Sequence, residues 1–373
     1  MSSTLSPQSR LFTPMRIGPV TLSHRVVMAP LTRLRCDESH VPLPIAETYY
    51  SQRASVPGTL LIAEATMISP AASGVPHGPG IWSPEQIQSW KRITDAVHAK
   101  GSFIFIQFVA PGRAAHAETL KRDSGKEVGA PSAIPMEEGA QVPVELTEDE
   151  IEDLIADFAT AGKNAMQAGF DGVEVHGANG YLVDEFTQDV SNQRTDGWGG
   201  SIEKRARFGI EIAKALSEAI GSERVGFRIS PWNTWQGMKM AEPVAQFSYL
   251  VRELRELKLG YLHIIESRVV NNVDCEKSEG IEPFLEVWGR DAPVLVAGGY
   301  NAKNAGDIDH VYQDNDVAVV FGRHFLANPD LPFRLKNGIP LQKYHRDTFY
   351  TPVQAEGYLD YPFSAEFEAT LKN

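Results

Sequence analysis

The sequence predicts a (β/α)8 barrel that forms one domain over residues 1–373. Two observations predict this fold: eight short apolar runs rich in β-branched residues recur along the chain, and segments with helical periodicity separate them. Apolar runs of this length are typical of strands that are buried on both faces, as in a parallel sheet. Eight such strands with intervening helices make a barrel of ordinary size with extensions. A doubly wound open sheet is the alternative, which the eightfold count and the absence of an early GxGxxG motif disfavour.

The expected strands follow the eight apolar runs in chain order. They cover residues 25–30, 60–66, 103–108, 172–176, 225–230, 261–266, 293–299 and 317–322. The expected helices lie between or after them, over residues 83–100, 147–167, 202–220, 242–257 and 302–312. Two helices have clear start signals: Ser83 precedes a proline at the first helical position, and Thr147 with Glu150 forms a capping-box pattern.

Three extensions to the barrel are expected. Residues 12–22, with a Gly-Pro turn, predict a β-hairpin that caps the bottom of the barrel. A long insertion over residues 111–143 follows the third strand, and another over residues 267–280 follows the sixth. The second insertion has little apolar content and is well placed to act as an active-site lid.

Composition and charge limit the classes of function. The net charge of −13 argues against nucleic acid or an anionic membrane as a partner. The chain has no run of about 18 apolar residues, and its N-terminus lacks the apolar core of a signal peptide, so we expect a cytoplasmic protein. The two cysteines, Cys36 and Cys275, are typical of a reducing compartment and are too few to ligate an iron–sulfur cluster.

Three polar residues follow the fourth expected strand closely: His176, Asn179 and Tyr181. His176 and Asn179 can donate paired hydrogen bonds to one carbonyl oxygen, and the Tyr181 phenol can supply a proton. Together they suit the polarisation of an enone and the protonation of its α-carbon. A histidine at a strand end is more often a packing residue than a catalyst, so the other strand ends have to be weighed with it.

Those strand ends carry groups that fit a phosphorylated cofactor. The last two strands end in Gly298-Gly299 and Gly322-Arg323, where backbone N–H groups and a guanidinium can bind phosphate; tight turns are the alternative role for the glycines. Thr32 and Gln107 add neutral hydrogen-bonding groups, and Arg228 adds a cation. This combination suits flavin mononucleotide (FMN), whose anionic reduced ring a nearby cation stabilises. A structural ion pair is an equally good explanation of Arg228.

The residues alone leave other chemistries of a phosphate-binding barrel open. An aldolase or isomerase needs a Schiff-base lysine or a carboxylate base at a strand end. No lysine is there, and Glu64 and Glu266 are the only carboxylates close by. A metal-dependent hydrolase needs histidines at ligand spacing, whereas His24, His263 and His324 are scattered without a motif, so no metal is expected.

The chain resembles a known family at this point, the Old Yellow Enzymes, which are flavin-dependent ene-reductases. The likeness covers nearly the whole chain and rests on six motifs in order: Met28-Ala-Pro-Leu-Thr-Arg33, Pro79-Gly-Ile-Trp-Ser83, His176-Gly-Ala-Asn-Gly-Tyr181, Gly199-Gly-Ser-Ile-Glu203, Phe321-Gly-Arg323 and Asn328-Pro-Asp-Leu331. Each motif alone is weak, but six in order along one barrel pattern are highly specific. Thr32 indicates the Thr-bearing fungal type, similar to aldehyde reductases of ergot-alkaloid pathways.

The resemblance implies an FMN-dependent enzyme that reduces the activated C=C bond of α,β-unsaturated aldehydes or ketones with NADPH. It implies that FMN is held by Pro30, Leu31, Thr32, Ala65, Gln107, Arg228, Gly298, Gly299, Gly322 and Arg323, with Phe349 near the ring. His176 and Asn179 would bind the substrate carbonyl, and Tyr181 would protonate the α-carbon. Tyr350 and Trp232 would also contact the substrate. Such enzymes are monomers or homodimers, and a barrel that binds flavin without ene-reductase turnover is the remaining alternative.

Two positions depart from the pattern of the family. Val109 stands where the yeast enzymes often have tryptophan, and Val75 stands where an aromatic residue often lines the pocket. Both substitutions leave more room, which Trp232 and Trp235 beyond the fifth strand can refill. The resemblance therefore leaves the natural substrate open.

Overall fold

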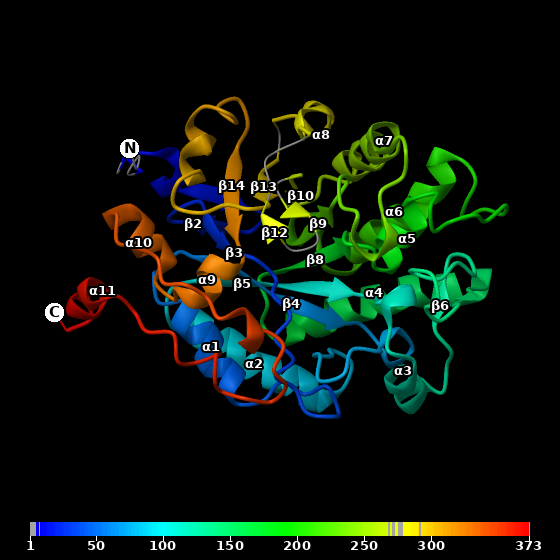
Figure 1. Ribbon diagram of the computed structural model, residues 1–373, viewed down its shortest axis with the longest axis horizontal. Coiled ribbons are helices and arrows are strands. Elements are labelled where there is room, and N and C mark those ends of the chain that lie inside the picture. Colours follow the sequence, from blue (N-terminus) through cyan, green and yellow to red (C-terminus); the bar gives the residue numbers. More distant parts are fainter. Residues whose placement is uncertain are drawn as a thin grey trace.

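The computed structural model describes residues 5–6, 8–267, 269–270, 273–274, 279–290 and 292–372. Its centre is a closed barrel of eight parallel strands, in which β14 pairs with β3 to complete the ring (Figure 1). Around the ring the strands are β3 (Val26–Met28), β4 (Leu60–Met67), β5 (Phe103–Val109), β8 (Gly172–Gly177), β9 (Val225–Ile229), β10 (Tyr261–Ile265), β13 (Val294–Ala297) and β14 (Val317–Phe321). The prediction of a (β/α)8 barrel is confirmed.

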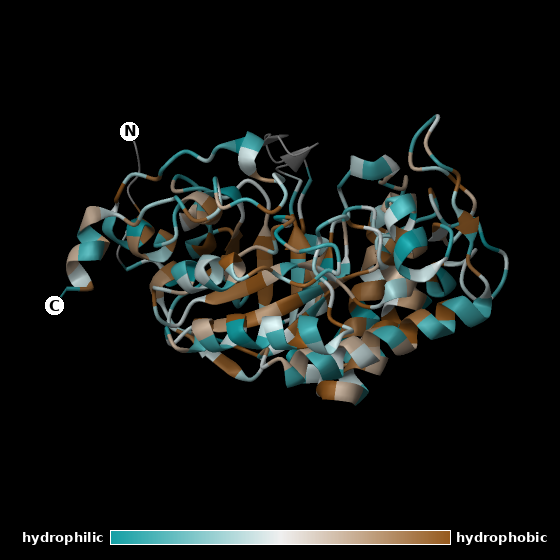
Figure 2. Cartoon of the chain, turned by 90° about the horizontal axis from the view of Figure 1, so that it is seen from below, coloured by the Kyte–Doolittle hydropathy of each residue, from teal (hydrophilic) through white to brown (hydrophobic). Residues whose placement is uncertain are grey.

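The strands form where the apolar runs predict them, and each observed strand overlaps its run. They are buried on both faces, since helices cover the outside and side chains fill the inside; β8 and β9 are buried at every position. Figure 2 shows this arrangement as hydrophobic strands in the middle of the molecule, with helices of mixed hydropathy around them.

Helices surround the barrel and occupy its C-terminal extension. They are α1 (Ile45–Arg53), α2 (Pro84–His98), α3 (Ala117–Ser124), α4 (Glu148–Gln167), α5 (Leu182–Thr187), α6 (Ile202–Ile220), α7 (Pro243–Glu256), α8 (Glu282–Trp288), α9 (Arg323–Ala327), α10 (Leu331–Asn337) and α11 (Ala365–Thr370). Both predicted start signals are realised: Ser83 with Gln86, and Thr147 with Glu150, form complete capping boxes. None of the helices in the described ranges has the length and apolar character needed to cross a membrane.

The helix predicted over residues 302–312 is wrong. The segment contains only a short 3-10 helix, η6 (Ala305–Asp309). Asparagine side chains explain the difference because they bond the local backbone in place of a helical ladder. The Asn304 side chain accepts a hydrogen bond from the Asn301 N–H at 2.7 Å, and the Asn301 side chain accepts one from the Lys303 N–H at 2.8 Å.

The predicted N-terminal hairpin is present as β1 (Met15–Ile17) and β2 (Val20–Leu22), paired antiparallel. Its inward side chains are buried and belong to the same hydrophobic cluster as Leu60, Phe105 and Leu295 of the barrel strands. Because these barrel residues lie at or near the start of their strands, the hairpin closes the end of the barrel opposite to the carboxyl ends.

Both predicted insertions leave the barrel at the carboxyl ends of strands. The first, after β5, contains the 3-10 helix η3 (Gly112–Ala114), α3, and β6 (Gly129–Ala130), which pairs with β7 (Val144–Glu145). The second, after β10, contains an antiparallel pair, β11 (Val269–Val270) and β12 (Val273–Asp274). Residues 268, 271–272 and 275–278 of the predicted lid lie outside the described residues.

Candidate active site

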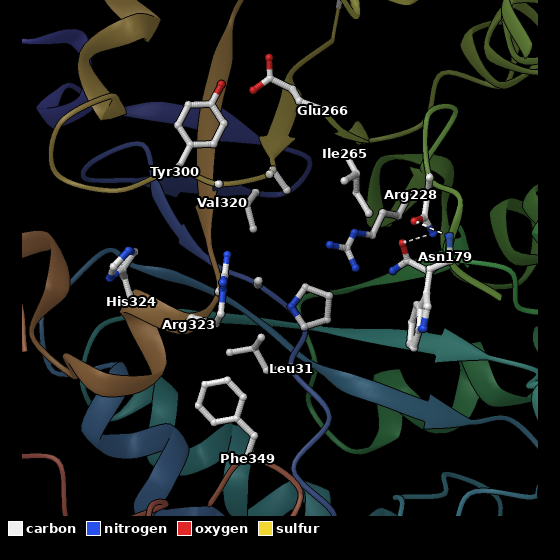
Figure 3. Close-up of a pocket in the computed structure, with 18 of the residues that line it drawn as sticks. Leu31, Asn179, Arg228, Ile265, Glu266, Tyr300, Val320, Arg323, His324 and Phe349 are labelled. Carbon is white, nitrogen blue, oxygen red and sulfur yellow. Dashed lines mark hydrogen bonds between the residues drawn. The ribbon is translucent and has the colours of Figure 1, made fainter. Parts of the chain in front are cut away.

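A cavity of about 220 Å³ opens at the carboxyl ends of the barrel strands (Figure 3). Segments that follow β3, β8, β9, β10, β13 and β14 supply its walls, together with the C-terminal extension. Ten of the predicted site residues line it: Pro30, Leu31, Asn179, Arg228, Gly298, Gly299, Gly322, Arg323, Phe349 and Tyr350. The barrel topology therefore collects residues that lie up to 320 positions apart in the sequence.

The glycines on one wall let the backbone approach the cavity. Gly298 and Gly299 have φ values of +120° and +65°, which favour glycine, and a Cβ atom on Gly298 would lie 3.1 Å from the Glu266 carbonyl oxygen. Gly322 precedes Arg323, and the Arg323 side chain extends toward the cavity in Figure 3. Backbone N–H groups next to a guanidinium fit the phosphate of FMN.

Arg228 supplies the second cation of the cavity. Its side chain extends from β9 into the cavity (Figure 3), yet the residue is only 9% exposed. Its Nε atom is buried without a hydrogen-bond partner, and no ion pair or hydrogen bond joins the Arg228 guanidinium to any of the described residues. Burial lowers the pKa of this guanidinium, although the nearby Glu174 carboxylate opposes the shift. The structure therefore does not show the structural ion pair, and a buried cation of this kind fits the electron-rich edge of a flavin ring.

Glu174 is a buried carboxylate in the barrel that the sequence analysis did not identify. It accepts hydrogen bonds from Gln107 Nε2 at 2.7 Å, from the Tyr261 hydroxyl at 3.0 Å and from His263 Nδ1 at 2.8 Å. Burial raises the pKa of Glu174, but His263, Arg228 and Gln107 together hold it below its ordinary value. The bond to Glu174 also orients the amide of Gln107, so that its carbonyl oxygen points away as an acceptor. The sequence signal that could have identified Glu174 is a glutamate within an apolar strand run.

His176 and Tyr181 lie next to each other at the end of β8. Their ring centroids are 4.8 Å apart and the planes meet at 66°. Burial, and secondarily the charges of Arg228 and His263, lower the pKa of His176 well below its ordinary value, so the imidazole is neutral at physiological pH. Its buried Nδ1 atom has no partner among the described residues. A neutral imidazole with a spare nitrogen fits hydrogen bonding to a substrate carbonyl.

Asn179 is held in a left-handed backbone conformation, with φ of +60°. Its backbone N–H donates to Ser230 Oγ at 2.7 Å, and its side-chain Oδ1 accepts from Asn233 Nδ2 at 3.3 Å. Because Oδ1 is used in this way, the amide presents its N–H groups elsewhere, and Asn179 lines the cavity. The side chain is therefore available as a donor.

The remaining predicted residues do not line the cavity. Thr32 follows Leu31 and is half-buried. Ala65 is the one partly exposed residue of β4 and lies where the β4–β5 register shifts, which re-aims side chains at that strand end. Gln107 is buried and, like His176 and Tyr181, lies outside the cavity wall.

The structure also does not place Trp232 at the cavity. Its ring packs against Phe284 of α8 with centroids 5.7 Å apart, and Lys239 Nζ lies 5.8 Å from it. Trp235 lines the cavity instead and is 39% exposed. The irregular loop after β9 decides which tryptophan faces the site, and no sequence periodicity predicts such a loop.

Two further residues near the site were missed. Gln236 follows Trp235; its side chain donates a hydrogen bond to the Asn179 carbonyl, and its amide lowers the pKa of the nearby Tyr181 phenol. Glu185 on α5 is buried against Arg113, whose backbone N–H it accepts at 2.9 Å. A glutamine in an irregular loop gives no signal in a single sequence. Glu185 shares a six-residue helix with the equally buried Asp184. Only the burial of the whole helix, which the structure shows, distinguishes Glu185 from a surface glutamate.

The sequence profile of the NADH:flavin oxidoreductase / NADH oxidase family matches residues 10–342 of the chain. The chain therefore belongs to this family. An NADP-dependent oxidoreductase of Aspergillus flavus is 54% identical over 95% of this chain and 97% of the relative. A chanoclavine-I aldehyde reductase of Penicillium roqueforti is 50% identical over 98% and 99%, and a protein of Epichloe festucae var. lolii, 51% identical over 96% of each chain, is named a probable inactive reductase.

Solved structures give the same result at the level of the fold. An Old Yellow Enzyme from Pichia sp. AKU4542 superposes with a TM-score of 0.88 and 36% identity, over 96% of this chain and 95% of that one. The chain is thus an oxidoreductase of the Old Yellow Enzyme type, with FMN and a nicotinamide as its cofactors. This confirms the resemblance and removes the aldolase, isomerase and hydrolase alternatives.

Proposed function

We propose that this protein reduces the activated C=C bond of α,β-unsaturated aldehydes and ketones with NADPH. The observation that carries the proposal is the meeting of three groups beside the cavity: the neutral His176, the donor amide of Asn179 and the phenol of Tyr181. NADPH and the unsaturated carbonyl compound would use the same place in turn.

The cofactor end of the cavity has residues suited to FMN. Arg323 and the glycine backbones at positions 298, 299 and 322 would hold the phosphate, while Arg228 and the Gln107 carbonyl would face the ring. Leu31 and Phe349 line the apolar part of the wall. Bound FMN supplies the hydride chemistry, with the reduced nicotinamide as donor.

The substrate end would act on the carbonyl and on the α-carbon. His176 and Asn179 would donate hydrogen bonds to the carbonyl oxygen and stabilise the enolate charge that develops there, an effect typically of about 3 kcal/mol for one preorganised donor. Tyr181 would then give its hydroxyl proton to the α-carbon. Burial raises the pKa of Tyr181, so the phenol holds its proton at neutral pH.

The names of the relatives bear on activity and substrate. One relative is named a probable inactive reductase, so family membership alone does not establish turnover. The presence of His176, Asn179 and Tyr181 in this chain supports an active enzyme. The relative named chanoclavine-I aldehyde reductase supports an aldehyde as the substrate class.

The test is the visible absorption spectrum of the purified holoenzyme under anaerobic conditions. We expect flavin bands that bleach with NADPH and return when cyclohexenone or cinnamaldehyde is added. If NADPH bleaches the flavin bands but no unsaturated aldehyde or ketone restores them, the protein binds and reduces flavin without ene-reductase turnover. That result would contradict the proposal.

Tyr181→Phe gives the matching prediction for a single residue. It removes the acidic proton but keeps the ring, so NADPH should still bleach the flavin at the wild-type rate. Return of colour with the enone should slow by about 100-fold or more, the usual contribution of a general acid. Stopped-flow absorbance separates the two half-reactions. Equal slowing of both would argue against Tyr181 as the acid.

A further inference from the structure

Gln236 joins the loop after β9 to the loop after β8, which carries Asn179 and Tyr181. Its Nε2 atom donates a 2.8 Å hydrogen bond to the carbonyl oxygen of Asn179, and its amide lies close enough to the Tyr181 phenol to lower the pKa of that phenol. The loops approach so closely that a Cβ atom on Gly180 would lie 2.8 Å from the Gln236 Cβ. One amide group therefore holds the backbone of Asn179 and lies beside Tyr181, two of the three residues proposed to act on the substrate.

The backbone of Gln236 is held in a conformation that glutamine rarely adopts. Its φ is +60°, and the next residue, Gly237, has φ of +69°. Arg113 Nη2 donates a 2.9 Å hydrogen bond to the Gln236 carbonyl oxygen and so fixes this peptide from the opposite side. A non-glycine residue in the left-handed region is strained, and strain of this kind gathers at functional sites.

Proton donation leaves a charge that this amide can stabilise. In the proposed reaction the O–H bond of Tyr181 breaks, and its proton forms the new C–H bond with the electron pair of the enolate. The O–H electron pair stays on the phenol oxygen as tyrosinate. Burial and the neighbouring Tyr350 raise the pKa of Tyr181, whereas the Gln236 amide and the charge of Arg228 lower it.

We propose that Gln236 is a positioning residue for proton donation: its amide holds the Tyr181 hydroxyl in place and stabilises the tyrosinate that remains after the transfer. The tyrosinate regains its proton from solvent before the next turnover. This inference rests on the proposed function, since it takes Tyr181 as the acid.

Three substitutions distinguish the effect of the Gln236 amide from the effect of its backbone conformation. Gln236→Leu keeps the size of the side chain and removes the donor. Gln236→Glu has the same shape but places a carboxylate against the phenol, and Gln236→Asn keeps an amide but shortens its reach by one methylene group. Asparagine tolerates positive φ better than most residues, so this variant leaves the backbone unstrained. Gln313→Leu, at an exposed glutamine, is the matched control.

We expect Gln236→Leu to slow the return of flavin colour with the enone by about tenfold to a hundredfold, the effect of a hydrogen bond to a charged group. Gln236→Glu should slow it further and Gln236→Asn should also slow it. Bleaching by NADPH should keep its wild-type rate in all three, and Gln313→Leu should change neither rate. In a Tyr181→Phe background Gln236→Leu should slow this step much less than in the wild type, because only the bond to the Asn179 carbonyl is then lost.

A second measurement does not depend on turnover. Tyrosine labelled with ¹³C at Cζ reports the titration of each phenol, and the Tyr181 resonance is the one lost in Tyr181→Phe. It should titrate at higher pH in Gln236→Leu. An unchanged titration, or equal slowing by Gln236→Leu with and without the Tyr181 hydroxyl, would overturn the role of Gln236 alone. Unchanged enone reduction in Tyr181→Phe would overturn both this inference and the assignment of the acid.

Discussion

At the scale of single residues, Arg228 stands out because its charged side chain is buried without a direct partner among the described residues. The barrel buries its guanidinium, and none of the described carboxylates forms an ion pair with it. A buried guanidinium without a direct partner is costly, even with the Glu174 carboxylate nearby, unless a ligand binds it. The arrangement is therefore poised for an anionic or electron-rich ligand and makes little sense as a purely structural one.

Substitution of Arg228 should consequently change the redox properties of the flavin. In Arg228→Leu, loss of the cation should make the midpoint potential of bound FMN more negative, by about 30 mV for each tenfold loss in relative stability of the reduced form. Arg228→Lys keeps the charge and should retain most of the potential. Anaerobic reductive titration against a reference dye measures both variants. A potential that stays at the wild-type value in Arg228→Leu would show that the guanidinium does not face the ring.

At the scale of elements, α5 combines a short helix with two buried carboxyl groups. Burial raises the pKa of Glu185 to about 8 and that of Asp184 to about 7. Two partners moderate the shift for Asp184, the Gly180 N–H at 2.9 Å and Gln188 Nε2 at 2.8 Å. Oε2 of Glu185 is buried and has no hydrogen-bond partner among the described residues. The helix that follows Tyr181 is thus tied to the protonation state of two acids.

These shifts predict how stability depends on pH. The folded protein holds a proton on Glu185 up to about pH 8, whereas the unfolded chain loses it near the ordinary value of 4.5. Between these values the folded state binds more protons, so the free energy of unfolding should fall as pH rises, by up to about 1.4 kcal/mol per pH unit for this group. Glu185→Gln should flatten that slope. Urea unfolding at several pH values from 5 to 8 measures it, and identical slopes in both proteins would contradict the raised pKa.

Elements also show how far a single sequence reaches. The eight strands and four long helices were predictable because burial on both faces, or on one stripe, leaves a periodic pattern. The ends of parallel strands meet at one rim, so Gly298, Gly322 and Arg228 could be placed together without coordinates. The helix prediction for residues 302–312 was wrong because asparagine side chains replace the helical hydrogen bonds there.

Loops limited the prediction of the site itself. The choice between Trp232 and Trp235 depends on how the loop after β9 folds, and Gln236 reaches Tyr181 only through a left-handed backbone conformation. Neither feature follows a sequence periodicity from which it could be predicted. Glu174 could have been singled out as a charge within an apolar strand, but its three hydrogen bonds, from Gln107, Tyr261 and His263, form only in the closed barrel.

At the scale of the whole molecule, buried arginines near the N-terminus hold the C-terminal extension. Arg33 is 1% exposed and donates hydrogen bonds to the carbonyl oxygens of Phe349 at 3.1 Å and Gly357 at 2.7 Å. Its guanidinium also lies over the rings of Tyr49 and Tyr358, which stack with centroids 4.0 Å apart. The extension passes over α1 in Figure 1 and brings Phe349 to the cavity wall.

Arg33→Ala should therefore weaken both the fold and the retention of flavin. Two carbonyl groups lose a buried charged donor, so the free energy of unfolding should fall by about 3 kcal/mol or more. Phe349 should become less firmly held, and FMN should dissociate faster. Urea unfolding and the rise of free-flavin fluorescence measure the two effects. Arg16→Ala, on the exposed face of the hairpin, is the control; a variant of Arg33 that matches it in both measurements would refute the clamp.

The pairing that closes the barrel has a consequence for how the protein is made. Val319, Val320 and Phe321 pair with Val26, Val27 and Met28. One edge of β3 therefore stays unpaired until β14 has been synthesised. During translation a growing chain that stops before residue 317 has an open edge beside β3 and lacks Gly322 and Arg323 of the cavity wall. Phe349 emerges later still. Because Gly322, Arg323 and Phe349 line the cavity, we expect the cavity to be complete only after these late residues have been synthesised and folded.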